Sequence, residues 1–531
     1  MSIDLSRRTL LTSAAFAGFM SATHGFALTI VGAPTPIVQT KAGKVRGRMQ
    51  PEGLYSFKGL RYAAPPVGAL RFRPPPPLKP WAGVVEASDF GDAAMQTAGA
   101  GSLPSETHSE DCLYLHLWTK GLDNTRRPVM VWLHGGGFWE GAPGRPVYYG
   151  DHIAQQDVVI VTVTHRLNVF GYTQLPDSWG PEYKSSGIAG ILDIVAALRW
   201  VKANIEKFGG DPQNVTVFGE SGGGGKLSLL LNMPAATGLF QKAIIQSGAV
   251  LSANSNEYGQ ALGQALTDII GVSAGDVDAL SKVDAGKIFE AQDAAIAKVR
   301  DKAPKGFFSG LFSPTVDGVE LPRMPFDGGA PAAIGQIPLM IGSARNEANF
   351  FPDSATIIKE TDAQFEQRVR EAFPSEAAQL IPALRASYPG YKPGELSLQL
   401  ITAQMFWINT VKVADMKARQ PAPVFMYRFD WESLTRRNGV PMRAAHAIDV
   451  PIVFGTYDSM RVFVGPGDGP ARMSQQMMPA WVAFARTGRP DCEEIPAWPR
   501  YDLAKRHTML FNLESSVASD PLGEVRRLIA G

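Results

Sequence analysis

A run of glycines follows a serine and precedes a lysine in the stretch FGESGGGGKLS, residues 218–228. Two kinds of loop have this composition: one that binds phosphate through its backbone, and a turn that presents a nucleophilic serine. A phosphate-binding Walker loop needs the pattern G-x-x-x-x-G-K-[ST]. Aligning its Gly-Lys on residues 225–226 places Glu220 at the first glycine and Leu227 at the magnesium-binding position. Both anchors fail, so the phosphate-binding interpretation is set aside.

The pattern G-x-S-x-G fits residues 219–223, directly after the apolar run NVTVF. In a nucleophile elbow, a sharp turn between a strand and a helix holds the serine in a strained conformation with its hydroxyl exposed. Small neighbours are needed because the strand and the helix approach closely there. The helix-like run KLSLLLNMP follows. The pattern therefore predicts Ser221 as a nucleophile, with a plain glycine-rich turn as the alternative.

A serine hydroxyl needs a base to take its proton, and after such an elbow the chain order is serine, acid, histidine. Of the eight histidines, only His446 and His507 follow Ser221. His507 enters an expected late strand in AKRHTMLFN and is typical of a structural or surface histidine. His446 lies in RAAHAIDVP, a loop after the strand-like run VFMYRF. We therefore predict His446 as the base.

The acid should follow a later strand, between the serine and the histidine. Glu347 does so at the end of IPLMIGSARNE. Its carboxylate would hold the imidazole in the correct tautomer and stabilise its protonated form. Asp317 and Asp353 are the alternatives, but Asp317 begins an Asp-Gly pair typical of a turn, and Asp353 lies further past the strand.

Backbone amides could stabilise the oxyanion of such a reaction. The stretch VWLHGGGFWEG places Gly135, Gly136 and Gly137 directly after a strand-like run, and glycines let amides turn towards a developing charge. The Gly222 amide would be a further donor. Loss of one such donor typically costs about 10²–10³ in rate. A tight structural turn is the alternative for the triglycine.

The elements around these residues alternate between apolar strands and helices. Strand-like runs occur at PVMVWLHGGG, DVVIVTVTHR, NVTVFGES, KAIIQSG and IPLMIGSARNE. A helix is predicted over residues 190–210, with a stop at Gly209–Gly210 and one apolar face formed by Ile191, Val195, Leu198, Val201 and Ile205. This alternation predicts a doubly wound α/β domain, with a mostly parallel central sheet and helices on both faces. Residues 254–301 and 361–418 are predicted to be mostly helical and could form a cap.

Composition narrows the classes of function. The chain has 531 residues, of which 45% are hydrophobic, enough for a large core. Its 51 Lys and Arg against 50 Asp and Glu give a net charge of +1, with the basic residues scattered, which gives no support to a nucleic-acid partner. The chemistry predicted above requires neither a metal nor another cofactor.

The N-terminal segment is typical of an export signal. Arg7 and Arg8 precede a short apolar run over residues 10–20, and Gly25 and Ala27 fit a small-x-small cleavage site. The arginine pair resembles a twin-arginine signal, with an ordinary secretory signal or a disordered tail as alternatives. We therefore predict a signal over residues 1–27, a catalytic domain over 28–531, and a periplasmic or secreted protein. No stretch is long enough to span a bilayer.

The two cysteines, Cys112 and Cys492, lie far apart in the sequence. Two cysteines are few for an exported protein of this size. Two free thiols are favoured, with a disulfide between them as the alternative.

These stretches together resemble the type-B carboxylesterase family, the cholinesterase-like branch of the α/β-hydrolases, over nearly the whole mature chain. The blocks that carry the resemblance are GLRYAAPPVGALRFRPPPPLKPW, SEDCLYLHLWT, HGGGF, FGGDPQNVTVFGESGGG, GLFQKAIIQSG, GSARNEANFF, HAIDVPIVFGT and FARTGRPD. The resemblance implies an α/β-hydrolase fold with Ser221 as nucleophile, Glu347 as acid and His446 as base. It also implies oxyanion amides at Gly136, Gly137 and Gly222.

The chain departs from the family pattern at several positions. Gly222 replaces the usual alanine after the nucleophile, Ala447 replaces the usual glycine after the histidine, and Lys226 is unusual. Cys112 normally pairs with an earlier cysteine in the family, but this chain has Met95 there, which favours the free thiol.

The resulting expectation is a serine carboxylesterase that acts on a small-molecule ester through an acyl-enzyme. A catalytically silent binding protein and an acyltransferase are the rival functions. The aromatic stretches GGGFWEG, KGFFSGLF, NFF and MFW could line an ester pocket or belong to the core. The identity of the ester and the oligomeric state stay open.

Overall fold

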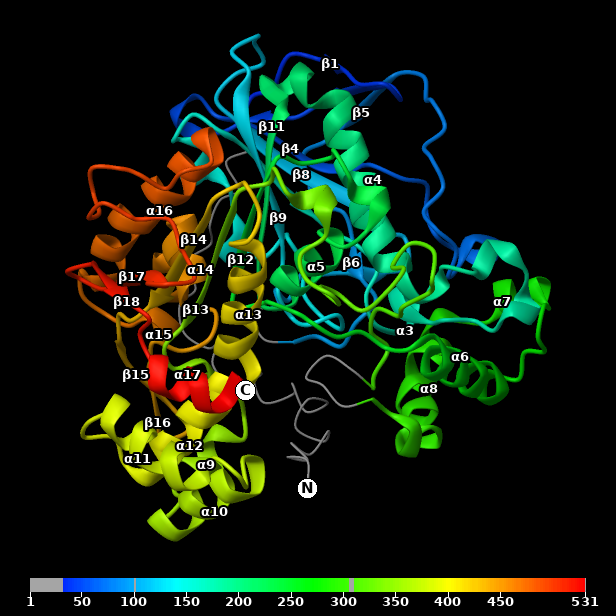
Figure 1. Ribbon diagram of the computed structural model, residues 1–531. Coiled ribbons are helices and arrows are strands. Elements are labelled where there is room, and N and C mark those ends of the chain that lie inside the picture. The colour runs from blue at the N-terminus through cyan, green and yellow to red at the C-terminus, as the bar shows by residue number, and fades with distance from the viewer. Residues whose placement is uncertain (1–31, 100–101, 305–309, 531) are drawn as a thin grey trace. The chain divides into compact units, whose positions relative to one another are not determined.

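The structure is a computed structural model that describes residues 32–99, 102–304 and 310–530 (Figure 1). The predicted signal over residues 1–27 lies outside the described residues. The described chain divides into two compact units. We call them the N-terminal unit, which comprises residues 32–244 and Val250–Ile337, and the C-terminal unit, which comprises Ile245–Ala249 and residues 338–530.

The N-terminal unit contains six strands that hydrogen-bond in the order β11-β9-β10-β8-β4-β3. The pairs β11–β9 and β9–β10 are parallel, whereas β10–β8, β8–β4 and β4–β3 are antiparallel. In register, Val131 of β9 lies opposite Val217 of β11 and Val161 of β10. All residues of β9 are buried, as expected of a strand covered on both faces of its sheet.

The strands of this unit are β1 (Val38–Gln39), β2 (Lys44–Arg46), β3 (Arg48–Met49), β4 (Tyr55–Arg61), β5 (Val84–Glu86), β6 (Ala93–Ala94), β7 (His108–Ser109), β8 (Tyr114–Thr119), β9 (Arg127–Leu133), β10 (Val159–Val163) and β11 (Gly210–Glu220). Its α-helices are α2 (Asp151–Ala154), α3 (Asn168–Tyr172), α4 (Ala189–Asn204), α5 (Gly222–Leu230), α6 (Asn256–Ile270), α7 (Val277–Lys282) and α8 (Ala285–Lys298). Strand β12 (Lys242–Gln246) lies where the chain passes from one unit to the other.

The five strand-like runs predicted around the site are strands β9 to β13, and the helix predicted over residues 190–210 is α4. The apolar face predicted for that helix is buried. Gly209 ends the following 3-10 turn in a left-handed conformation with φ of 76°, which explains why a glycine stops the helix there. The helices predicted over residues 254–301 are α6, α7 and α8, and α6 packs against α8 (Figure 1).

The C-terminal unit contains strands in the order β18-β17-β14-β13. The pairs β13–β14 and β14–β17 are parallel, and β17–β18 is antiparallel. Its strands are β13 (Leu339–Ala344), β14 (Val424–Phe429), β15 (Ser433–Arg437), β16 (Val440–Arg443), β17 (His507–Phe511) and β18 (Ser516–Ser519). Its α-helices are α9 (Ser354–Ile357), α10 (Asp362–Ala372), α11 (Ala377–Ser387), α12 (Pro393–Thr402), α13 (Ile408–Lys417), α14 (Asp449–Phe454), α15 (Arg461–Val464), α16 (Gly469–Thr487) and α17 (Gly523–Ala530).

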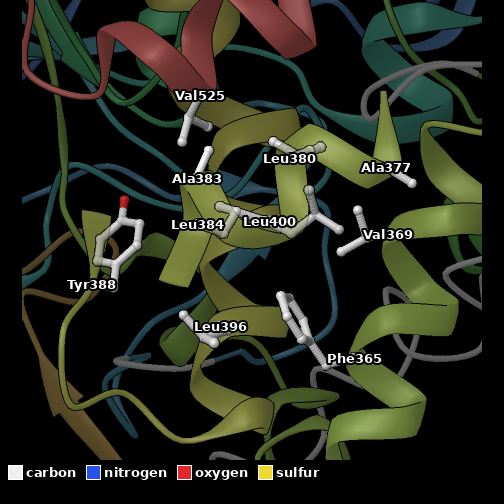
Figure 2. Close-up of a cluster of buried hydrophobic side chains, with 10 residues drawn as sticks. All are labelled: Phe365, Val369, Ala377, Leu380, Ala383, Leu384, Tyr388, Leu396, Leu400 and Val525. Atoms are coloured by element: carbon white, nitrogen blue, oxygen red, sulfur yellow. The ribbon is translucent and has the colours of Figure 1, made fainter. Parts of the chain in front are cut away.

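The helices predicted over residues 361–418 have a hydrophobic cluster of their own. Helices α10, α11 and α12 bury Phe365, Leu384 and Leu400 against one another, and Val525 of α17 joins them (Figure 2). In this view Leu384 and Leu400 lie between the other labelled side chains. These helices therefore share a hydrophobic core cluster of their own.

Both cysteines are free: Cys112 is buried and Cys492 is partly buried. The expectation of two free thiols is confirmed. Burial raises the pKa of the Cys112 thiol well above its usual value, so this group is inert as a nucleophile at neutral pH. Within the three described ranges, no helix has the length and apolar character that a membrane crossing requires.

Candidate active site

Ser221 lies at a sharp turn in the N-terminal unit, between the end of β11 and the start of α5. Its backbone has φ of 52° and ψ of −122°, a region that side-chain-bearing residues rarely adopt. Such a conformation costs of order 1–3 kcal/mol and persists only where the surrounding structure holds it. The turn therefore has the strained geometry that the G-x-S-x-G pattern predicts.

The glycines around Ser221 lie very close to other backbone atoms. A Cβ atom on Gly223 would lie 1.9 Å from the carbonyl oxygen of Leu133, and one on Gly219 would lie 2.6 Å from the carbonyl carbon of Gly223. A Cβ on Gly222 would lie 2.0 Å from the carbonyl oxygen of Gly137. The structure thus brings the elbow against the loop that follows β9, and it brings together two of the predicted oxyanion residues.

The loop after β9 takes backbone conformations that favour glycine. Gly136 and Gly137 have φ of 88° and 62°, in the left-handed region. The triglycine is therefore needed for this path of the chain, in addition to the role predicted for its amides.

Glu347 and His446 form a hydrogen-bonded pair in the C-terminal unit. Glu347 follows β13 in a 3-10 turn and is completely buried, and His446 lies between β16 and α14. The distance from His446 Nδ1 to Glu347 Oε2 is 2.5 Å. A proton on Nδ1, facing the carboxylate, leaves Nε2 as the ring nitrogen that can act as a base. This is the relation that the sequence predicted between the acid and the base.

The second carboxylate oxygen of Glu347 is held by two donors. Its Oε1 accepts hydrogen bonds from Ser247 Oγ and from the amide of Ala344, both at 2.6 Å. These bonds fix the plane of the carboxylate and therefore the position of the imidazole. Sequence analysis missed Ser247, which follows β12 in the run KAIIQSG. Its place after a strand that ends near the site was the available signal.

Asp449 is a second buried carboxyl near this pair that sequence analysis missed. Its Oδ2 accepts hydrogen bonds from Gln246 Nε2 at 2.9 Å and from the Tyr427 hydroxyl at 3.2 Å. Burial raises the pKa of Asp449 to about 6, although the hydrogen bond from Gln246 and the charge of His446 oppose the rise. The pattern HAIDVP placed a carboxyl three residues after the histidine, which was the only signal.

Aromatic rings pack around the imidazole of His446. Ring centroids of Phe350, Phe351 and Phe406 lie 5.7, 5.2 and 4.7 Å from it. Phe406 comes from a π-helical turn, Ala403–Trp407, between α12 and α13. Turns of this kind occur frequently at functional sites. The NFF and MFW stretches thus supply the apolar surroundings of the histidine.

The alternative residues have other partners. Asp317 Oδ1 accepts hydrogen bonds from the amides of Val319 and Leu321 at 3.0 and 2.9 Å, within the turn that the Asp-Gly pair indicated. His507 begins β17, half-buried, with Nδ1 3.8 Å from the Asp502 carboxylate. Ser221 and the three glycines belong to the N-terminal unit, and Glu347 and His446 to the C-terminal unit. Their joint assignment to one site stays a prediction.

Comparisons with known proteins identify the family. A sequence model of the carboxylesterase family matches residues 34–525. The chain belongs to the carboxylesterase family.

This carboxylesterase is similar to a para-nitrobenzyl esterase of Bacillus subtilis, with 36% identity over 92% of this chain and 98% of the relative. A human cocaine esterase is 31% identical, over 91% of this chain and 89% of its own length. Among solved structures, the Geobacillus stearothermophilus carboxylesterase EST55 aligns with a TM-score of 0.81 and 36% identity, covering 93% of this chain and all of that one. The α/β-hydrolase fold and carboxylic ester hydrolysis are therefore confirmed.

A methyl group at position 222 tests the close approach to Gly137. In Gly222→Ala the added Cβ overlaps the Gly137 carbonyl, so the loop after β9 must shift and its amides with it. We expect kcat for an ester to fall at least about tenfold, with little change in KM, because oxyanion donors act mainly in the transition state. Gly286→Ala in α8 is the control, since its methyl meets only the Asp284 side chain. An unchanged kcat in Gly222→Ala would show that the loop accommodates the methyl group.

The charge of Asp449 should shift the pH dependence of hydrolysis. A carboxylate near His446 favours the protonated imidazole and so raises the pKa of the histidine. Asp449→Asn removes this charge, and His446 is then protonated only at a lower pH. We expect the acid limb of the pH profile of kcat/KM to move to lower pH in this variant. Asp502→Asn, which removes an exposed carboxylate, should leave the limb in place. Coincident profiles for wild type and Asp449→Asn would contradict the electrostatic coupling.

Proposed function

We propose that this carboxylesterase forms its acyl-enzyme on Ser221, with His446 as the general base, Glu347 as the residue that orients it, and the amides of Gly136, Gly137 and Gly222 as oxyanion donors. The observation that carries the proposal is the hydrogen bond from His446 Nδ1 to the buried Glu347 carboxylate. The strained backbone of Ser221, at the turn that G-x-S-x-G predicts, supports it further.

The reaction then has two stages, acylation of Ser221 and hydrolysis of the acyl-enzyme. Ser221 Oγ attacks the ester carbonyl while His446 Nε2 takes its proton, and the tetrahedral oxyanion is stabilised by the three amides. When the bond to the alcohol oxygen breaks, His446 gives the proton to the departing alcohol. In the second stage His446 takes a proton from water, which attacks the acyl group, and collapse returns the proton to Ser221 and releases the acid. Every proton moves through this chain's own groups or water.

We further propose that the ester carries an apolar, aromatic group. Phe350, Phe351 and Phe406 surround the imidazole that would protonate the leaving alcohol, and aromatic rings bind other rings through stacked or edge contacts. The name of the para-nitrobenzyl esterase points to an ester with an aromatic group for that relative.

We propose in addition that the chain is exported from the cytoplasm of a bacterium. The support is the arginine pair, the short apolar run and the small residues at positions 25 and 27. N-terminal sequencing of the protein recovered outside the cytoplasm would test this: a first residue near position 28 is expected, and a start at Met1 would contradict it.

Replacement of the nucleophile is the decisive test of the mechanism. Ser221→Ala removes the attacking oxygen, so we expect ester turnover to fall by about 10⁴-fold or more, as in other serine hydrolases, with the thermal midpoint retained. A phosphonate should label wild type covalently but not the variant. Full activity in Ser221→Ala would overturn the proposal, and absence of both turnover and labelling in wild type would favour a silent binding protein.

A panel of esters that varies the acyl and alcohol groups separately tests the aromatic preference. We expect kcat/KM to be higher for an aryl-containing ester than for an aliphatic ester of equal size. Phe350→Ala should narrow that ratio, whereas Phe425→Ala, which removes a buried ring of β14 that contacts Phe484 and Trp498, should not. A ratio near one in wild type would contradict the preference. Added alcohol that outcompetes water would favour the acyltransferase function.

A further inference from the structure

Lys226 is a buried lysine that the mechanism leaves unused. It lies on α5, five positions after Ser221, and its side chain is fully buried. Its Nζ donates a hydrogen bond to the carbonyl oxygen of His134 at 3.0 Å. His134 is the residue directly before the triglycine, so one side chain connects the helix of the elbow to the start of the oxyanion loop.

The titratable groups that face Lys226 come from three other elements. His134 follows β9, His165 follows β10, and Glu220 ends β11. The two imidazole rings stack with centroids 4.8 Å apart, and the Nδ1 atoms lie 2.8 and 3.0 Å from the carbonyl oxygens of Gly135 and Arg166. Burial, with the charge of Lys226, lowers the pKa of both histidines well below the usual value, so both are neutral.

Two opposing effects act on the pKa of Lys226. Burial lowers the pKa of the ammonium to about 7, and the carboxylate of Glu220 opposes that change. The ring of Phe138, 5.8 Å from Nζ, adds a weakly favourable aromatic face. A cation in such a place costs stability, and costs of this kind are typical of groups kept for function.

We propose that Lys226 is a positioning residue for ester hydrolysis: its ammonium holds the His134 carbonyl and thereby fixes the glycine loop whose amides receive the oxyanion. The inference rests on the proposed function. Three consecutive glycines are the most permissive backbone a loop can have, so an unanchored loop would lose entropy each time it formed the donor geometry. A charge-assisted hydrogen bond at the start of the loop removes most of that cost in advance.

The kinetic test is Lys226→Met, which keeps length and apolar volume but has no donor. We expect kcat to fall at least about tenfold with KM within about twofold, because a misplaced amide weakens the transition state and not the bound ester. Wild-type kcat should also decline above about pH 7, as the ammonium loses its proton, and this decline should be absent in the variant. Lys417→Met is the matched control, since Lys417 is also buried, with a pKa lowered to about 8, and lies on α13.

The melting temperature of Lys226→Met distinguishes a positioning role of Lys226 from a structural one. Because the folded-state pKa of Lys226 lies below that of the unfolded chain, wild type gains stability as pH rises from about 7 to 10, and the Met variant lacks this gain. We therefore expect Lys226→Met to melt no lower than wild type at pH 7, and its advantage to shrink towards pH 10. A structural lysine would give the opposite result, a lower melting temperature with kcat and KM of the folded fraction unchanged.

The outcomes for Lys226 and Ser221 are distinguishable. Unchanged kcat and an unchanged pH profile in Lys226→Met, with Ser221→Ala inactive, would overturn the positioning role and leave the acyl-enzyme mechanism intact. Activity in Ser221→Ala would overturn the mechanism itself. If Lys226→Met fails to fold, Lys226→Gln serves instead: it keeps a neutral donor, so a partial loss of kcat and loss of the decline above pH 7 are expected, and wild-type behaviour would contradict the proposal.

Discussion

A steric constraint between two pieces of backbone shapes the elbow that carries Ser221. The elbow at Ser221 and the loop after β9 approach so closely that a single methyl group on Gly222 would overlap the Gly137 carbonyl. Gly219 and Gly223 are glycines for the same reason, one against the other and both near Leu133. The glycine run of the elbow and the triglycine therefore pack against each other, although the sequence separates them by some eighty residues.

The C-terminal unit buries the carboxyl groups of Glu347 and Asp449. Glu347 is completely buried. One of its carboxylate oxygens accepts hydrogen bonds from Ser247 and from the amide of Ala344, and the other lies against the imidazole of His446. The buried Asp449 carboxyl accepts hydrogen bonds from Gln246 and Tyr427, and Trp481 Nε1 in turn donates to Gln246 at 3.0 Å. A buried carboxylate is tolerated only with such partners. The same donors that make burial tolerable also fix the orientation of the group, which an imidazole partner requires.

The sequence predicted what depends on local pattern. Strands β9 to β13, the helix α4 with its glycine stop, and the pairing of Glu347 with His446 all follow from periodicity, turn residues and chain order. For Ser247 and Asp449 the sequence carried only a weak signal, because their importance depends on contacts with residues 100 and 203 positions away. The hydrogen-bond partner of Lys226 could not be predicted for the same reason, because the His134 carbonyl lies 92 residues upstream. Ala447 is a milder case: its φ of 64° falls in the left-handed region, which explains why the family usually has glycine there.

The two thiols have a consequence for how the chain can be produced. Both cysteines are free, and they are the only two in the sequence, so no covalent cross-link restrains the unfolded chain. Stability therefore comes from non-covalent interactions, such as the packing in the cluster of α10, α11 and α12. The fold therefore contains no disulfide that an oxidant or a disulfide isomerase would have to form.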